Sequence, residues 1–244
     1  MGFTSALLFV LLCVSLLSLV DGKRKWDKLD PEIKFFYPGG HYIMLTFNDA
    51  IHESLTPKLL DMLKQRMARV TLFVQGNKVG ANKDLVIRAV AERHEIANYG
   101  WDLSAKTTSP PDEEIVDQVV KTSNAVESVV GKKTSVYRPP STPAKAFKYE
   151  SRHAGLLSEG GPQHQHHHQV ILHSLDGDAG GTITTVNDLE SKLMGAKKGD
   201  VIMCTLSAEA IDATARFIDK FMEEGYEFVT LSEMMSFPDD KPHR

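Results

Sequence analysis

The sequence predicts an α/β protein of one main domain, a deformed (β/α) barrel with about seven parallel strands. Short apolar runs of strand length alternate with stretches of helical spacing along most of the chain, and the connections between them are short. This alternation is the pattern of a parallel sheet covered by helices. About seven or eight such units in about 220 residues fit a barrel better than an open doubly wound sheet.

The composition is that of an ordinary globular domain. The chain has 244 residues, of which 42% are hydrophobic and 25% charged, enough to bury one sizeable core. The formal net charge of −4 provides no basic surface, so nucleic acid is not an expected partner. The sequence contains no glycine-rich phosphate loop and no G-x-S-x-G nucleophile turn.

The N-terminal residues have the features of a secretion signal. Residues 6–20 form an apolar run, which has the length of a signal-peptide core and is short for a membrane span. We predict a signal peptide over 1–22, an N-terminal extension over 23–40, the barrel domain over 41–237 and a frayed tail over 238–244. An uncleaved anchor is the alternative. The expected location is secreted or extracellular, in a wall or matrix, with no stable membrane span after cleavage.

The first half of the chain supplies the core strands. Residues 42–47 are an unbroken β-rich apolar run, as in a strand buried on both faces. The longest helix begins at Asp112 and is ended by Gly131, and proline stops the strand before 139–140. The predicted strands of this half are 42–47, 70–74, 95–97 and 136–138, and the predicted helices are 55–67, 84–93 and 112–130.

The second half repeats the rhythm. Its predicted strands are 169–175, 200–205 and 227–230, and its predicted helices are 147–157, 186–196, 208–224 and a closing turn at 231–235. Cys204 lies in a buried strand and is interpreted as a small core residue. In barrels the chemistry lies on the loops after the strands. These are the loops after Phe47, Ala97, Arg138, Leu175 and Thr205.

These loops belong to segments with a recognisable order. The segments read Leu-Thr-Phe-Asn-Asp at 45–49, Val-Thr-Leu-Phe-Val-Gln-Gly at 70–76, His-Glu-Ile-Ala-Asn at 94–98, Tyr-Arg-Pro-Pro at 137–140 and Gly-Tyr-Glu-Phe-Val-Thr-Leu at 225–231. Through them the chain resembles the polysaccharide deacetylases, carbohydrate esterase family 4, which include chitin deacetylases. The resemblance runs from about residue 42 to 236.

The resemblance implies metal-assisted removal of N-acetyl groups from a sugar polymer. In that family an aspartate and two histidines hold a divalent metal, which lowers the pKa of its bound water to about 7. A second carboxylate is the base, an arginine holds that carboxylate, and a histidine oriented by an aspartate is the acid.

The base and two of the three metal-ligand positions are changed in this chain. Asn48 stands at the base position, and an amide is not basic. The metal-binding aspartate is kept as Asp49, but Tyr99 and Leu103 occupy the two histidine positions. Tyrosine ligates only as a phenolate, whose ordinary pKa is about 10, and leucine has no ligating atom. The metal set is therefore incomplete, and no cofactor is expected.

The other site positions are partly kept. Arg138 matches the arginine that holds the base, and Asp176 matches the aspartate that orients the acid. Thr205 stands where the catalytic histidine is expected. Tyr137, Arg138 and Trp101 are candidate substrate contacts, although for Trp101 a core position is the favoured interpretation.

Other residues are candidates for a rebuilt metal site. His52 and Asp102 lie close to family ligand positions, and surface roles are favoured for both. His164, His166, His167 and His168 form a histidine-rich tract, a composition that binds transition metals. Its favoured interpretation is a solvated loop below the barrel, away from Asp49. His94 is expected to pack at the start of a strand.

Three functions remain open. The leading hypothesis is a secreted, catalytically impaired or inactive deacetylase-like protein that acts as a glycan-binding or structural component of a wall or matrix. Chitin or another N-acetylglucosamine polymer is then the expected partner. The alternative is an active metal-dependent N-deacetylase with a rearranged site and zinc or cobalt at Asp49. A purely structural barrel is the third.

Overall fold

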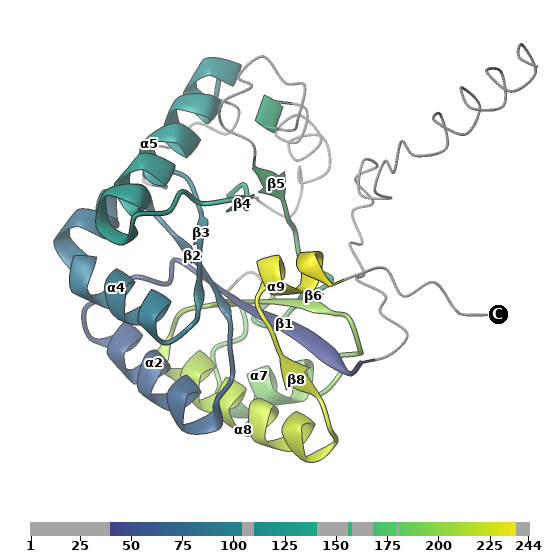
Figure 1. Cartoon of the computed structure of the whole chain (residues 1–244). Coiled ribbons are helices and arrows are strands. Elements are labelled where there is room, and N and C mark those ends of the chain that lie inside the picture. Colours follow the sequence, from purple (N-terminus) through teal and green to yellow (C-terminus); the bar gives the residue numbers. More distant parts are fainter. Residues whose placement is uncertain (1–39, 104–109, 141–155, 158–167, 180, 238–244) are drawn as a thin grey trace, which may run out of the picture. The chain divides into compact units, whose positions relative to one another are not determined.

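The computed structural model describes residues 40–103, 110–140, 156–157, 168–179 and 181–237 (Figure 1). In these residues every strand pairing is parallel, in one sheet with the order β5-β4-β3-β2-β1-β7-β6, and β8 pairs with β1 beside this path. The strands are β1 (Tyr42–Asn48), β2 (Thr71–Val74), β3 (Glu95–Asn98), β4 (Val136–Tyr137), β5 (Gln169–Val170), β6 (Leu175–Asp176), β7 (Val201–Thr205) and β8 (Glu227–Phe228).

The helices connect the strands, and most of them cover the outside of this sheet (Figure 1). They are α2 (Leu55–Arg66), α3 (Gly76–Val79), α4 (Lys83–Ala91), α5 (Asp112–Val130), α7 (Val186–Leu193), α8 (Ala208–Glu223) and α9 (Leu231–Ser236), with a 3₁₀ turn η1 (Gly80–Asn82). Neighbouring helices contact one another in the order α5, α4, α2, α8, α7, which makes a continuous outer layer (Figure 1). The sheet with this layer is a curled half-barrel, so the predicted deformed (β/α) barrel is confirmed.

Strand β1 lies at the centre of the sheet. From Ile43 to Asn48 every residue is buried, as expected for a strand covered on both faces. Its first half pairs with β8 and its second half with β2 along one side, while β7 pairs along the other side. The central strand therefore carries its C-terminal residues, Asn48 and then Asp49, to the middle of one rim.

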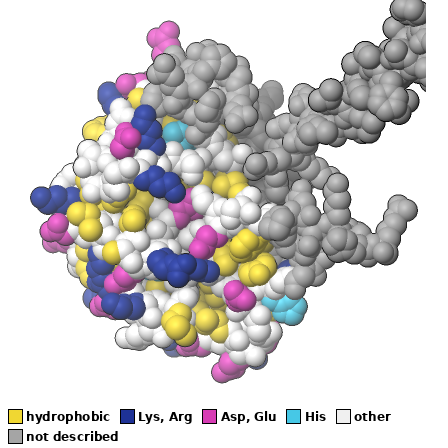
Figure 2. Space-filling model, in the orientation of Figure 1, with side chains coloured by type: hydrophobic (Ala, Val, Ile, Leu, Met, Phe, Trp, Pro, Cys, Tyr) yellow, Lys and Arg dark blue, Asp and Glu magenta, His cyan; other side chains and the backbone are white. Residues whose placement is uncertain are grey.

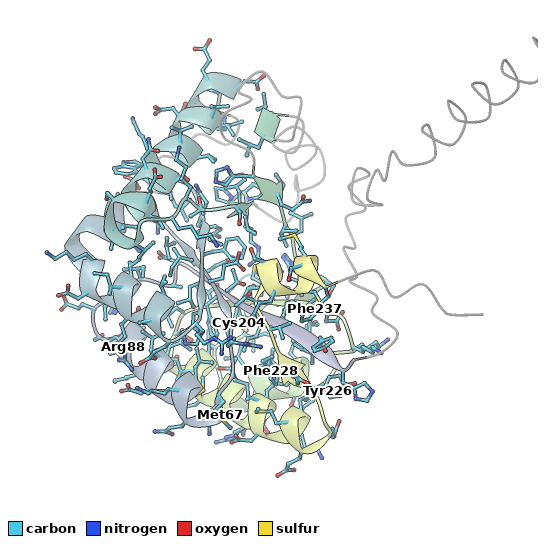
Figure 3. The ribbon with its side chains drawn as sticks, in the orientation of Figure 1. Met67, Arg88, Cys204, Tyr226, Phe228 and Phe237 are labelled. Carbon is cyan, nitrogen blue, oxygen red and sulfur yellow. The ribbon has the colours of Figure 1, made fainter. Side chains whose placement is uncertain are left out.

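The core beneath β1 is closed by α8. The Ser207 hydroxyl accepts a hydrogen bond from the Ala210 N–H at 3.0 Å and so caps the helix start. Phe217 lies 4.4 Å from Phe221 and 5.6 Å from Phe228 between ring centroids. Figure 3 shows Phe228 and its neighbour Tyr226 beside this helix. Ring packing of this kind fixes the last strand against the outer layer.

One predicted strand is two strands in the structure. Residues 169–175 were expected as one element, but β5 ends at Val170 and β6 begins at Leu175. The N–H of Ile171 donates to the Tyr137 carbonyl, and that of Ser174 donates to the Val201 carbonyl. These partners lie on strands near opposite ends of the sheet path. One straight strand cannot pair with both, so the chain leaves β5 and crosses to β7.

Several sequence predictions fall outside the described residues. These are the signal peptide 1–22, nearly all of the extension 23–40, the tail 238–244 and most of the helix 147–157, of which residues 156–157 are helical. The short helix α3 and the turn η1 were not predicted. Within the described ranges, no helix is both long and apolar enough to cross a membrane.

Candidate functional site

Two of the predicted site positions meet where β1 and β7 end. Asn48 and Thr205 are direct register partners in the parallel pair, and Asp49 follows Asn48 in the left-handed region at φ 51°. A left-handed backbone is uncommon for a non-glycine residue and marks a tight turn. The structure thus brings together the residues at the family's base, acid and first ligand positions.

Arg138 is the buried centre of this rim. It follows β4, and 2% of it is exposed. Its Nη1 donates to Thr46 Oγ1 at 2.8 Å and to Asn48 Oδ1 at 2.9 Å. Its Nε and Nη2 donate to the carbonyls of Ile171 and Leu172 at 3.3 and 2.8 Å. One guanidinium therefore joins β1 to the segment that crosses between β5 and β6.

The environment of Arg138 keeps it charged. Its Cζ lies 4.0 Å from the centroid of the Phe73 ring, a cation–π arrangement. Burial lowers the pKa of the Arg138 guanidinium to about 9, which still leaves it protonated at neutral pH. Arg138 donates to Asn48, the residue at the predicted base position, and its role in the family's chemistry stays a prediction.

Asn48 is held at both ends of its amide. Its Oδ1 accepts from Arg138, and its Nδ2 donates to the Tyr99 hydroxyl oxygen at 3.2 Å. Burial raises the pKa of the Tyr99 phenol above its ordinary value. Tyr99 is therefore a neutral phenol near neutral pH, and a neutral phenol is a poor metal ligand.

Asp49 forms an ion pair with Lys78. The Nζ of Lys78 lies 2.6 Å from Oδ1 and 2.8 Å from Oδ2 of Asp49, and Gln75 Nε2 donates to the same Oδ1 at 2.6 Å. The side chains of Lys78 and Asp49 are 36% and 37% exposed. Because water screens the pair, its strength as an ion pair is modest. The resemblance places the family's metal at this position.

The side chains at this point do not fit a divalent metal. Leu103 offers only its backbone, whose N–H donates to Gln75 Oε1 at 3.0 Å. The Nδ1 of His52, an exposed residue, accepts from the Ser54 and Leu55 N–H groups at 3.2 and 3.4 Å, at the start of α2. Across the described ranges, no three His, Cys, Asp or Glu side chains, including Asp102, group as metal ligands.

The position of the acid has a different aspartate beside it from the one expected. Asp178 is 4% exposed, and its Oδ2 accepts from the Thr205 N–H at 2.6 Å. Asp176, the predicted counterpart, lies in β6 paired with Met203. Asp178, two residues further along the chain, thus contacts position 205 through the backbone N–H of Thr205.

The predicted substrate contacts have mixed surroundings. Tyr137 is 3% exposed and packs in a small cluster with Val119, Leu157 and Val170, which is the setting of a core residue. Trp101 is partly buried, and a Cβ at Gly76 would lie 2.5 Å from its Cε3. Both rings thus have packing partners, and their contact with a substrate stays a prediction.

The histidine-rich tract is described only at its last residue. His168 is buried, and its Nε2 lies 2.8 Å from Thr134 Oγ1, so the prediction of a solvated loop is wrong for this residue. It directly precedes β5, and its backbone N–H donates to the Leu157 carbonyl at 3.0 Å. His164, His166 and His167 lie outside the described residues. His94 is 5% exposed just before β3, as expected.

Four residues of the site were not identified from the sequence. Gln75 and Lys78 follow β2, and the loop after β2 was not among those selected. Because β2 pairs directly with β1, the loops after these two strands are neighbours, and this signal was available. Asp178 was passed over in favour of Asp176. His173 was missed as well: burial first, and the nearby Arg138 second, lower its pKa to about 4.

The fold is a half-barrel whose rim carries the residues at the predicted base, acid and first ligand positions. The family model described as polysaccharide deacetylase matches residues 37–155. The peptidoglycan-N-acetylglucosamine deacetylase PgdA of Listeria monocytogenes is 29% identical over 201 residues, which are 79% of this chain and 38% of that protein. The chain therefore spans well under half the length of this relative.

Solved structures share the fold. Peptidoglycan deacetylase PdaC of Bacillus subtilis superposes with a TM-score of 0.64 at 24% identity, covering 82% of this chain and 92% of that one. A CE4 family pseudoenzyme from Bacillus anthracis superposes with a TM-score of 0.65 at 21% identity, covering 82% and 67%. A mutant of that pseudoenzyme, described as having restored enzymatic activity, matches equally well. The chain is thus polysaccharide deacetylase-like: the family model covers nearly half of it, and solved structures of the CE4 family share its fold.

Proposed function

We propose that this chain is a secreted, non-hydrolysing member of the family that binds N-acetylglucosamine-containing glycan of a cell wall. The observation that carries the proposal is the amide of Asn48 at the base position. Its oxygen accepts from Arg138 and its nitrogen donates to Tyr99. Both ends of the amide are thus engaged, and neither can accept a proton from water.

The expected loss of catalytic rate supports the proposal that the chain does not hydrolyse N-acetyl groups. A positioned general base or acid contributes about 10²- to 10⁴-fold to a rate, and Asn48 and Thr205 remove one of each. The metal that would lower the pKa of water from about 15.7 to about 7 has no ligand set here. These factors do not multiply simply, but together they place hydrolysis of an N-acetyl group by the family route near the uncatalysed rate.

Glycan binding is proposed from the relatives and from the kept framework. The names of the Listeria and Bacillus relatives specify peptidoglycan deacetylases, so a peptidoglycan-type glycan is favoured over the chitin expected from the sequence alone. The rim of β1, β7 and the loop after β4 is kept in its architecture, with Arg138 in place. A wall location follows from the same reasoning and from the predicted signal peptide.

Acetate release and calorimetry test the two halves of the proposal. We expect no acetate above the blank from N-acetylglucosamine oligomers or soluble peptidoglycan fragments, with zinc, cobalt or neither. We expect binding heat with at least one of these glycans. Absence of heat at millimolar ligand would remove the binding half and leave a structural role.

The rival function, an active deacetylase with a rearranged site, makes the opposite prediction. It requires metal-dependent acetate release by the unaltered chain that is lost in Asp49→Ala. As a positive control, Asn48→Asp, Tyr99→His, Leu103→His and Thr205→His are combined in one variant, together with Lys78→Met to free Asp49 from its ion pair. Activity in this variant, but not in the unaltered chain, would show that the assay and the glycan are suitable.

A further inference from the structure

We propose that the ammonium group of Lys78 is a built-in replacement for the divalent cation of the deacetylase site. It lies 2.6 and 2.8 Å from the two oxygens of Asp49, the residue that the resemblance assigns as the kept metal ligand. A cation of the protein itself thus binds the carboxylate that binds the metal in the family. The proposal goes beyond the loss of hydrolysis, because it assigns a residue that opposes metal binding.

Backbone hydrogen bonds attach the turn that carries Lys78 to the loop between Tyr99 and Leu103, the two positions assigned to the histidine ligands. Lys78 belongs to α3, a helix of four residues that directly follows β2 and Gln75. The N–H groups of Gly76 and Asn77 donate to the carbonyls of Gly100 and Trp101 at 3.0 and 3.1 Å. A Cβ at Gly76 would lie 2.4 Å from Thr122 Oγ1, so only glycine permits this close approach to α5. These contacts hold the turn in place, and the turn positions Lys78 beside Asp49.

Hydrogen bonds join the positions that a metal would otherwise join. Gln75 accepts from the Leu103 N–H through Oε1 and donates to Asp49 through Nε2, at 3.0 and 2.6 Å. Tyr99, at the remaining ligand position, receives the hydrogen bond from Asn48. Residues 49, 99 and 103 are each tied into the rim without an ion. A metal is not needed to hold these loops in place.

The charges at this point also balance without a metal. Asp49 carries one negative charge and Lys78 one positive charge, in contact. A divalent ion at Asp49 has to displace the ammonium or sit beside it, and like charges in contact repel even where water partly screens them. Lys78 is thus expected to weaken metal binding even where suitable ligands are supplied.

The test measures zinc affinity in a chain whose ligands have been restored. Tyr99→His with Leu103→His is compared with the same pair plus Lys78→Met, by competition with a chromophoric chelator. We expect Lys78→Met to tighten zinc binding at least about tenfold, because it removes the like charge at contact distance. Lys83→Met, an exposed lysine at the start of α4, is the matched control and should change the affinity less than about twofold. Equal affinities with and without Lys78 overturn the proposal.

A second measurement needs no restored site. The thermal midpoint of the unaltered chain should be the same in EDTA and in one equivalent of zinc. Zinc held by the histidine tract 164–168 is recognised because it persists in Asp49→Ala. A zinc-dependent rise in the midpoint that Asp49→Ala abolishes overturns the proposal. Neither measurement uses acetate release or glycan binding, so its failure is distinct from failure of the proposed function.

Discussion

Replacing Arg138 by methionine tests whether its guanidinium holds the half-barrel together. The substitution removes hydrogen bonds to Thr46, Asn48 and the carbonyls of Ile171 and Leu172. Each buried acceptor left unpaired costs about 1 to 3 kcal/mol. The Thr46 hydroxyl can turn to another partner, and the variant no longer buries a cation, which offsets several kcal/mol. We expect a net loss of about 3 kcal/mol in the free energy of unfolding.

Urea unfolding followed by circular dichroism measures this loss. Arg138→Lys keeps the charge but has donors on one nitrogen only, so it cannot reach β1 and residues 171–172 together. It should therefore lose most of the same free energy. Arg69→Met is the control, because the Arg69–Glu233 pair at 3.0 Å is partly exposed and should cost less than about 1 kcal/mol. A loss below about 1 kcal/mol for Arg138→Met would refute the idea that this guanidinium holds the half-barrel together.

Two further predictions concern buried titratable groups. Burial lowers the pKa of His94 to about 4 in the folded chain, while an unfolded histidine titrates near 6.5, so the unfolded state takes up the proton first as the pH falls. The free energy of unfolding should be constant above about pH 6.5 and fall by up to about 3 kcal/mol towards pH 4. His94→Gln should flatten the His94 part of this slope in urea titrations, and His173 contributes in the same pH window; an unchanged slope in His94→Gln contradicts the assignment. Cys204 is 1% exposed, and burial raises the pKa of its thiol, so a thiol reagent should label it only as the protein unfolds. Rapid labelling of the native chain would show that β7 is more open than described (Figure 3).

Most of the strand and helix pattern was predictable because it depends on local periodicity. The run 42–47, the helix 112–130 and the strand 200–205 each appear within a residue or so of their predicted bounds. The prediction of a single strand over 169–175 was wrong. The residue types indicate β propensity, but they do not indicate which strands these residues pair with. Whether a run pairs with one strand or crosses between two depends on the curvature of the whole sheet.

The site was predictable where its residues lie at the C-terminal ends of neighbouring parallel strands. Asn48, Asp49 and Thr205 lie where the C-terminal ends of parallel strands placed them. Lys78 was not predictable in the same way, since a lysine in a polar stretch has the same sequence signature as any surface lysine. Figure 2 shows Lys and Arg side chains interspersed with Asp and Glu on the face in view. Only the contact of Lys78 with Asp49 distinguishes it from these.

The placement of β1 has a consequence for how the chain folds. Met44 pairs with Val201, and Ile43 pairs with Phe228, so two of the three neighbours of the first strand come from the last part of the domain. Contacts between such distant residues require closure of a long loop, which slows folding. During synthesis, β1 has only β2 beside it until nearly the whole domain has been made. We therefore expect C-terminal truncation before β7 to leave an unfolded chain rather than a smaller stable domain.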